Sequence, residues 1–135
     1  FVAPARLEFV PTLGDGANNY TLSFAQGYYS LVNDLVFWEA LLIWTSIGSA
    51  TATRLRMGGL PLTSVNLSLI QFPVSIGTLE GIDTTATENM ITCNLGGNST
   101  EAHFFRANDN AAMTGVPANS SSASGRLYLS GHYRI

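Results

Sequence analysis

Two histidines and a single cysteine are the side chains of this sequence best suited to acid–base or nucleophilic chemistry. His103 lies in an apolar run and His132 lies near the end of the sequence, and neither belongs to a recognisable catalytic motif. Cys93 has no second cysteine with which to form a disulfide or a CxxC metal site, so we interpret it as a buried thiol in a strand. The sequence therefore predicts no enzyme activity, no catalytic residue, no metal site and no cofactor.

Sugar binding is the chemistry that the remaining side chains favour. Aromatic rings pack against the apolar C–H faces of sugars, while Asn, Asp and Gln bind the hydroxyl groups. Tyr20 follows two asparagines in an expected loop, so we expect its ring at the surface as a glycan contact. The cluster Asn108, Asp109 and Asn110 is a second candidate contact, for sugar or for Ca²⁺. It lacks the spacing of an EF-hand, so a plain turn is the alternative.

Four large side chains are candidates for the core or for a subunit interface: Trp38, Leu42, Trp44 and Tyr133. The two tryptophans lie among aliphatic residues in an expected strand, which favours burial. A role as a sugar-binding platform would instead require one of the tryptophans to be exposed.

The charge content argues against several classes of function. Only 11% of the 135 residues are charged, against about 25% in a typical soluble chain, and the six basic residues, all arginines, are outnumbered by nine acidic ones. A nucleic-acid-binding surface needs a basic stripe, so we expect no nucleic-acid partner. No apolar run reaches the roughly 18 residues of a membrane span, so we expect no membrane insertion.

The elements that must position these residues are short strands. Apolar runs alternate with Gly, Asn, Ser, Thr and Pro, which indicates roughly eight to ten strands in one domain over residues 1–135. Asn33 and Asp34 separate two β-rich runs and predict a hairpin. The final segment, 125–134, alternates cleanly and must be paired inside a sheet to stay ordered. The fold class that follows is all-β, an antiparallel two-sheet β-sandwich resembling a jelly roll.

Residues 35–47 are the main ambiguity, because their apolar positions also fit helical spacing. We favour a strand, since the run is rich in Val, Phe, Trp, Ile and Thr and follows a short turn. As a strand it is apolar on both faces. One face then packs on the core, and a neighbouring subunit is the simplest cover for the other.

Three blocks of sequence carry a resemblance to a known family. They are GYY at 27–29 followed by LVFW at 35–38, TATRLRMGGLPL at 51–62, and LYLSGHYR at 127–134. In this order they resemble the C-terminal β-sandwich head domains of bacteriophage tail fibres and tailspikes. One departure is the turn Asn33-Asp34, where proteins of this kind often have Gly-Asn or Gly-Asp. Asn tolerates the backbone conformation that such a turn needs.

The resemblance implies a homotrimeric head at the tip of a phage tail fibre, located on the virion and extracellular. Such a head trimerises the fibre, contacts bacterial surface polysaccharide, or does both. The start, Phe1-Val2-Ala3-Pro4, is not an initiator end, so we interpret the chain as a C-terminal fragment of a longer protein. Two alternatives remain: a monomeric carbohydrate-binding module of an extracellular enzyme, and a viral capsid or decoration jelly roll.

Overall fold

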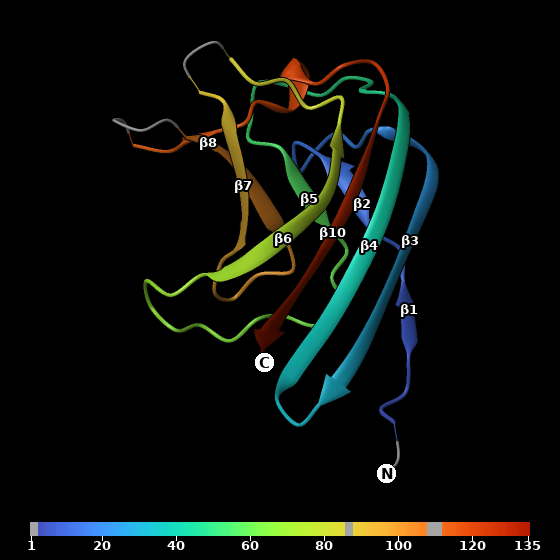
Figure 1. Ribbon diagram of the computed structural model, residues 1–135, viewed down its shortest axis with the longest axis vertical. Coiled ribbons are helices and arrows are strands. Elements are labelled where there is room, and N and C mark those ends of the chain that lie inside the picture. Colours follow the sequence, from blue (N-terminus) through green and yellow to red (C-terminus); the bar gives the residue numbers. More distant parts are fainter. Residues whose placement is uncertain (1–2, 86–87, 108–111) are drawn as a thin grey trace.

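The computed structural model describes residues 3–85, 88–107 and 112–135, and it shows an all-β, antiparallel protein (Figure 1). The strands are β1 (Leu7–Phe9), β2 (Thr12–Gly14), β3 (Thr21–Val32), β4 (Leu35–Ser46), β5 (Arg56–Gly58), β6 (Phe72–Glu80), β7 (Met90–Leu95), β8 (Ala102–Ala107), β9 (Thr114–Gly115) and β10 (Gly125–Arg134). A single turn of 3₁₀ helix, η1 (Ala118–Ser120), precedes β10.

All ten strands belong to one continuous sheet in the order β1-β3-β4-β10-β6-β7-β8-β5-β2, with β9 beside β8. The sheet curls as a half-barrel around one hydrophobic core (Figure 1). The predicted all-β, antiparallel fold class is therefore confirmed. Two separate sheets, as in the expected sandwich, are not confirmed, because one hydrogen-bonded ladder runs through the whole strand order.

Pro11 lies between the first two strands, β1 and β2. The chain pairs with β3 through β1 and with β5 through β2, at opposite ends of the strand order. Proline has no N–H to donate to a ladder, so a strand usually ends at it. Only Val10 and Pro11 separate the two strands, and this short link brings the two ends of the strand order close together.

The β3–β4 hairpin turns at Asn33 and Asp34, as the sequence predicted, with Val32 paired to Leu35. Asn33 adopts a φ of 56°, a conformation that Asn tolerates well. Residues 35–46 form a strand and not a helix. Along β4 the side chains alternate strictly between the core and the outside, so the face holding Trp38, Leu42 and Trp44 is buried.

The final strand, β10, lies in the middle of the sheet between β4 and β6 (Figure 1). Its ten residues pair with β4 without a register shift, from Gly125 opposite Trp44 to Arg134 opposite Leu35. Leu127, Leu129 and Tyr133 are fully buried on its inner face. The prediction that this strand is paired inside a sheet is confirmed, and its two ladders explain why it is ordered.

Candidate functional site

The outward side chains of β5, β7 and β8 build the first candidate site. On β8, Ala102 and Phe104 point into the core, so His103 and Phe105 must point outward. The register places Asn94 of β7 on one side of His103 and Arg56 of β5 on the other. Polar residues from three strands thus meet on one outer face of the sheet.

These strands border a surface hollow of about 290 Å³, which we name the polar groove. Besides two glycines, the polar groove is lined by Arg54, Gln71, Asn94, Ser99, His103 and Phe105. A concave site with convergent polar side chains is the usual form of a ligand site.

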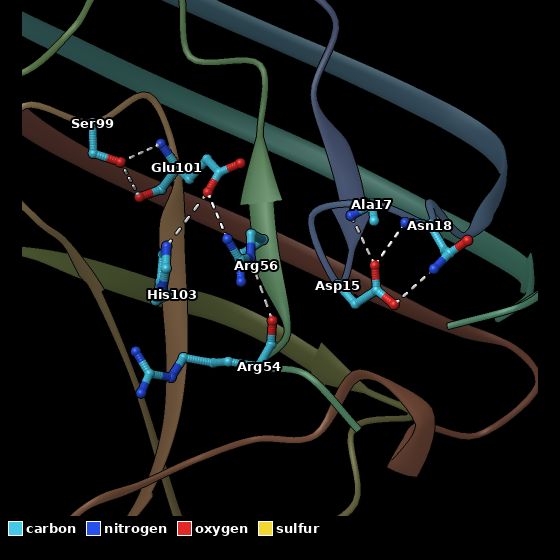
Figure 2. Close-up of polar contacts among 8 residues, drawn as sticks. All are labelled: Asp15, Ala17, Asn18, Arg54, Arg56, Ser99, Glu101 and His103. Atoms are coloured by element: carbon cyan, nitrogen blue, oxygen red, sulfur yellow. Dashed lines mark hydrogen bonds and ion pairs between the residues drawn. The ribbon is translucent and has the colours of Figure 1, made fainter. Parts of the chain in front are cut away.

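An ion-pair cluster lies beside the polar groove (Figure 2). The Glu101 carboxylate accepts a hydrogen bond from Arg56 Nη1 at 3.0 Å, and His103 Nε2 lies 3.6 Å from the same oxygen. Burial lowers the pKa of His103 below its usual 6.5, with smaller contributions from Arg56 and Arg54, while Glu101 raises it. His103 is therefore neutral at pH 7, and the glutamate balances a single arginine.

Arg54 is the other cation of the groove, and its side chain extends across β8 near His103 (Figure 2). Its guanidinium carbon lies 4.5 Å from the centre of the Phe105 ring, a cation–π distance. The absence of a side chain at Gly115 makes room for this arrangement, because a Cβ there would lie 2.6 Å from Arg54 Nε. The guanidinium is thus held at the groove by an aromatic ring and the backbone.

A second candidate site lies on the outer face of β3, β4 and β10, which Figure 1 shows on the other side of the molecule from β7 and β8. We name it the outer apolar surface and define it by Phe24, Tyr28, Phe37, Leu41 and Tyr128. The two phenylalanines are each 46% exposed. Two shallow hollows of about 270 and 210 Å³ lie on this surface, on either side of Tyr28 and Glu39.

One polar network crosses the outer apolar surface. Glu39 accepts hydrogen bonds from Arg6 Nη2 at 3.0 Å and from the Tyr128 hydroxyl at 2.8 Å. The Arg6 guanidinium also lies 3.6 Å from the centre of the Tyr28 ring. Arg6 and Glu39 are thus paired with each other within the surface. The side chains that define the surface are apolar or aromatic.

The expectation that Tyr20 lies at the surface is wrong. Its side chain is only 4% exposed, and its hydroxyl donates to the carbonyl of Ala118 and lies 2.8 Å from Ser121 Oγ. The ring packs on Trp44 with centroids 5.6 Å apart. Tyr20 therefore ties the segment around η1 to the core and offers no face to a sugar.

The other predicted positions divide into two groups. Asn108, Asp109 and Asn110 lie outside the described residues. The four candidates for core or interface, Trp38, Leu42, Trp44 and Tyr133, all lie in the core of the chain itself, with at most 4% exposure. Cys93 is a buried thiol in β7, as expected, and burial raises its pKa.

Sequence reasoning considered His103 only for acid–base chemistry and missed the other residues of the polar groove. The signal was present as two pairs of polar residues with a spacing of two, Arg54 with Arg56 and Glu101 with His103. Such spacing places both members of a pair on one face of a strand. The strand register that brings the two pairs together was not visible in the sequence.

Asp15 shows a polar cluster with a structural role (Figure 2). Its buried carboxylate accepts hydrogen bonds from the backbone N–H groups of Ala17, Asn18 and Thr51 at 2.6–2.8 Å. These bonds, with those from the side chains of Asn18 and Thr51, hold the pKa of Asp15 well below its usual range. With every oxygen engaged, Asp15 fixes two loops and is not available to a ligand.

Metal clusters and membrane-spanning helices are both lacking within the described residues. No group of three or more His, Cys, Asp or Glu side chains within residues 3–85, 88–107 and 112–135 is placed to hold a metal ion. Within the same ranges, no helix has the length and apolar character required to cross a membrane.

The fold has a clear counterpart among solved structures, the crystal structure of Dettilon tailspike protein (gp208). The two superpose with a TM-score of 0.78 at 17% sequence identity, over 96% of this chain and 23% of that chain. The chain therefore has a fold found in part of a phage tailspike, and it spans less than a quarter of that protein's length. No protein-family model matches the sequence, and no curated protein matches it.

Proposed function

We propose that this chain is a non-enzymatic domain of a bacteriophage tail fibre or tailspike, which forms a homotrimer at the fibre tip and contacts bacterial surface glycan. The observation that carries the proposal is the tailspike fold, which extends over 96% of the chain. The sequence blocks that resemble tail-fibre heads support it independently.

The outer apolar surface supports self-association. Exposed aromatic side chains gather on three adjacent strands, and contiguous patches of this kind mark interaction sites. Arg6 and Glu39, which lie within the patch, already pair with each other, so a second copy would not leave either of them without a partner. Trimer formation would place three glycan sites on one rigid head, and multivalency then raises the overall affinity.

The alternative of a monomeric carbohydrate-binding module with a tryptophan platform is disfavoured. Trp38 is 4% exposed and Trp44 is fully buried, so neither ring can receive a sugar. A capsid or decoration protein would also be oligomeric, and its function would lack the glycan contact.

Light scattering on a sizing column, followed by a glycan array, tests the proposal. We expect a solution mass of about three times the 14.4 kDa of one chain, together with binding to bacterial polysaccharides. A monomer at all concentrations would overturn the trimer. A trimer that binds no glycan would leave a purely structural role in the particle.

A further inference from the structure

We infer that the polar groove on β5, β7 and β8 is the glycan contact and that it takes an acidic saccharide, a sugar ring carrying a carboxylate. This inference rests on the proposed receptor-binding function and deepens it, because it assigns the site and the chemical class of the ligand.

Arg54 supplies the recognition of the acid. Its side chain is exposed at the groove and forms no ion pair with any of the described carboxylates. A guanidinium presents a planar fork of N–H donors that matches a carboxylate, and such charge-assisted pairs are among the strongest hydrogen bonds in proteins. The packing against Phe105 and Gly115 fixes the side chain before a ligand arrives, which reduces the entropy lost on binding.

The local charge favours an anion. Arg56 and Glu101 neutralise one another at 3.0 Å, so among the described residues the charge of Arg54 is left in excess beside the hollow. The chain as a whole carries a net charge of −3, which makes a positive groove a departure from the rest of the molecule. Local positive charge raises both the on-rate and the specificity for an acidic ligand.

The amide side chains supply the recognition of the sugar. Gln71 and Asn94 line the hollow, and their side chains make no hydrogen bond to any other residue within the described ranges. An amide carries both a donor and an acceptor, as a sugar hydroxyl does, so two free amides can bind adjacent hydroxyls. The hollow, at about 290 Å³, is close to the lower limit of typical ligand pockets, which suits one ring and its substituents.

The test uses a matched pair of probes. The full chain is titrated by calorimetry with oligomers of galacturonic acid and with oligomers of galactose, which differ in the carboxylate at C6. The same protein is screened on an array of neutral, carboxylate-bearing and phosphate-bearing bacterial glycans. We expect binding to carboxylate-bearing glycans, at least tenfold tighter than to their neutral counterparts and weakened by added salt.

Two variants assign the site. Arg54→Ala should weaken binding of the acidic glycan roughly tenfold or more, because a charge-assisted hydrogen bond is lost. Arg126→Ala is the control, since Arg126 is also an exposed arginine without an ion pair to the described carboxylates, but lies on β10 away from the groove. Its affinity should stay within twofold of the wild type.

Each contrary outcome would overturn a defined part of the inference. Binding to neutral glycans alone, or to phosphate-bearing glycans alone, would overturn the acidic-sugar assignment and leave receptor binding standing. Equal loss in both arginine variants, or none in Arg54→Ala, would overturn the assignment to the groove. Absence of binding to every glycan on the array would overturn the inference and the receptor-binding function together.

Discussion

The two outer surfaces of this protein are built on the same curled sheet and differ in almost every chemical respect. Over β3, β4 and β10 the outward positions include a patch of phenylalanine, tyrosine and leucine, while the polar groove over β5, β7 and β8 is lined by arginine, histidine and amide side chains. The inner faces of both regions contribute to one core. Strand alternation determines which side chains face outward, and the residues at these positions then decide what each surface can bind.

The largest expected effect comes from the core that the two surfaces share. Trp44 is fully buried, and its indole N–H donates to the Ser122 carbonyl at 3.0 Å. Trp44→Ala should lower the free energy of unfolding by about 3–5 kcal/mol, measured by urea denaturation, and should impair both surfaces together. Phe24→Ala, on the outside, is the control and should cost much less. Similar losses in the two variants would contradict the shared core.

The second prediction separates the surfaces. Phe37→Arg places a charge within the outer apolar surface and should convert the trimer to a monomer in light scattering, because an unpaired charge is costly to bury between copies. Binding of acidic glycan per chain should be unchanged in calorimetry. Val10→Arg is the control, since Val10 is 72% exposed outside this surface, and it should remain trimeric. If the Phe37→Arg protein remained trimeric, the trimer interface would have to lie on another surface.

The third prediction concerns the charge balance of the polar groove. Glu101→Gln removes the carboxylate that offsets Arg56, so the affinity for acidic glycan should rise roughly two- to fivefold in calorimetry. Glu80→Gln, at an exposed position of β6, should have no effect. Weaker binding in Glu101→Gln would show that the carboxylate acts chiefly by holding the arginine in place.

The smallest effect is a pH dependence carried by His103. Its folded-state pKa lies below the usual 6.5, mainly because of burial, so the unfolded chain binds the proton more readily. The stability contributed by neutral His103 is complete above pH 6.5 and is lost as the pH falls from there through the folded-state pKa. Melting temperatures between pH 7.5 and 5 should therefore fall less in His103→Gln than in the wild type. Equal slopes would show that another group titrates.

Local features of the fold were accessible from the sequence. The Asn33-Asp34 turn and the alternation over 125–134 each depend on neighbouring residues, and both were predicted correctly. The order of strands was not accessible, because pairing between β5 and β8 joins residues more than 40 positions apart. The tyrosine at position 20 was misplaced for the same reason, since its partners Ala118 and Ser121 come 98 and 101 residues later.

The same distinction between local and long-range features applies to the candidate sites. A doubly apolar β4 was visible in the sequence, and the structure shows its second face exposed at Phe37. The polar groove was not visible, because Arg54, Gln71, Asn94 and His103 come from four separate segments. Only the pairing of β5 with β8, of β8 with β7 and of β7 with β6 brings their side chains together.

The central place of β10 has a consequence for biosynthesis. It is the last of the described strands to leave the ribosome, yet it carries the hydrogen bonds that join β4 to β6. Until it emerges, the hairpin of β3 and β4 and the strands from β6 onward expose unpaired edges to the cytosol of the producing cell. Such edges invite aggregation. Maturation of this domain should therefore be sensitive to premature termination before or early in β10, because residues 126–131 carry its pairing with β6 and residues 125–134 its pairing with β4.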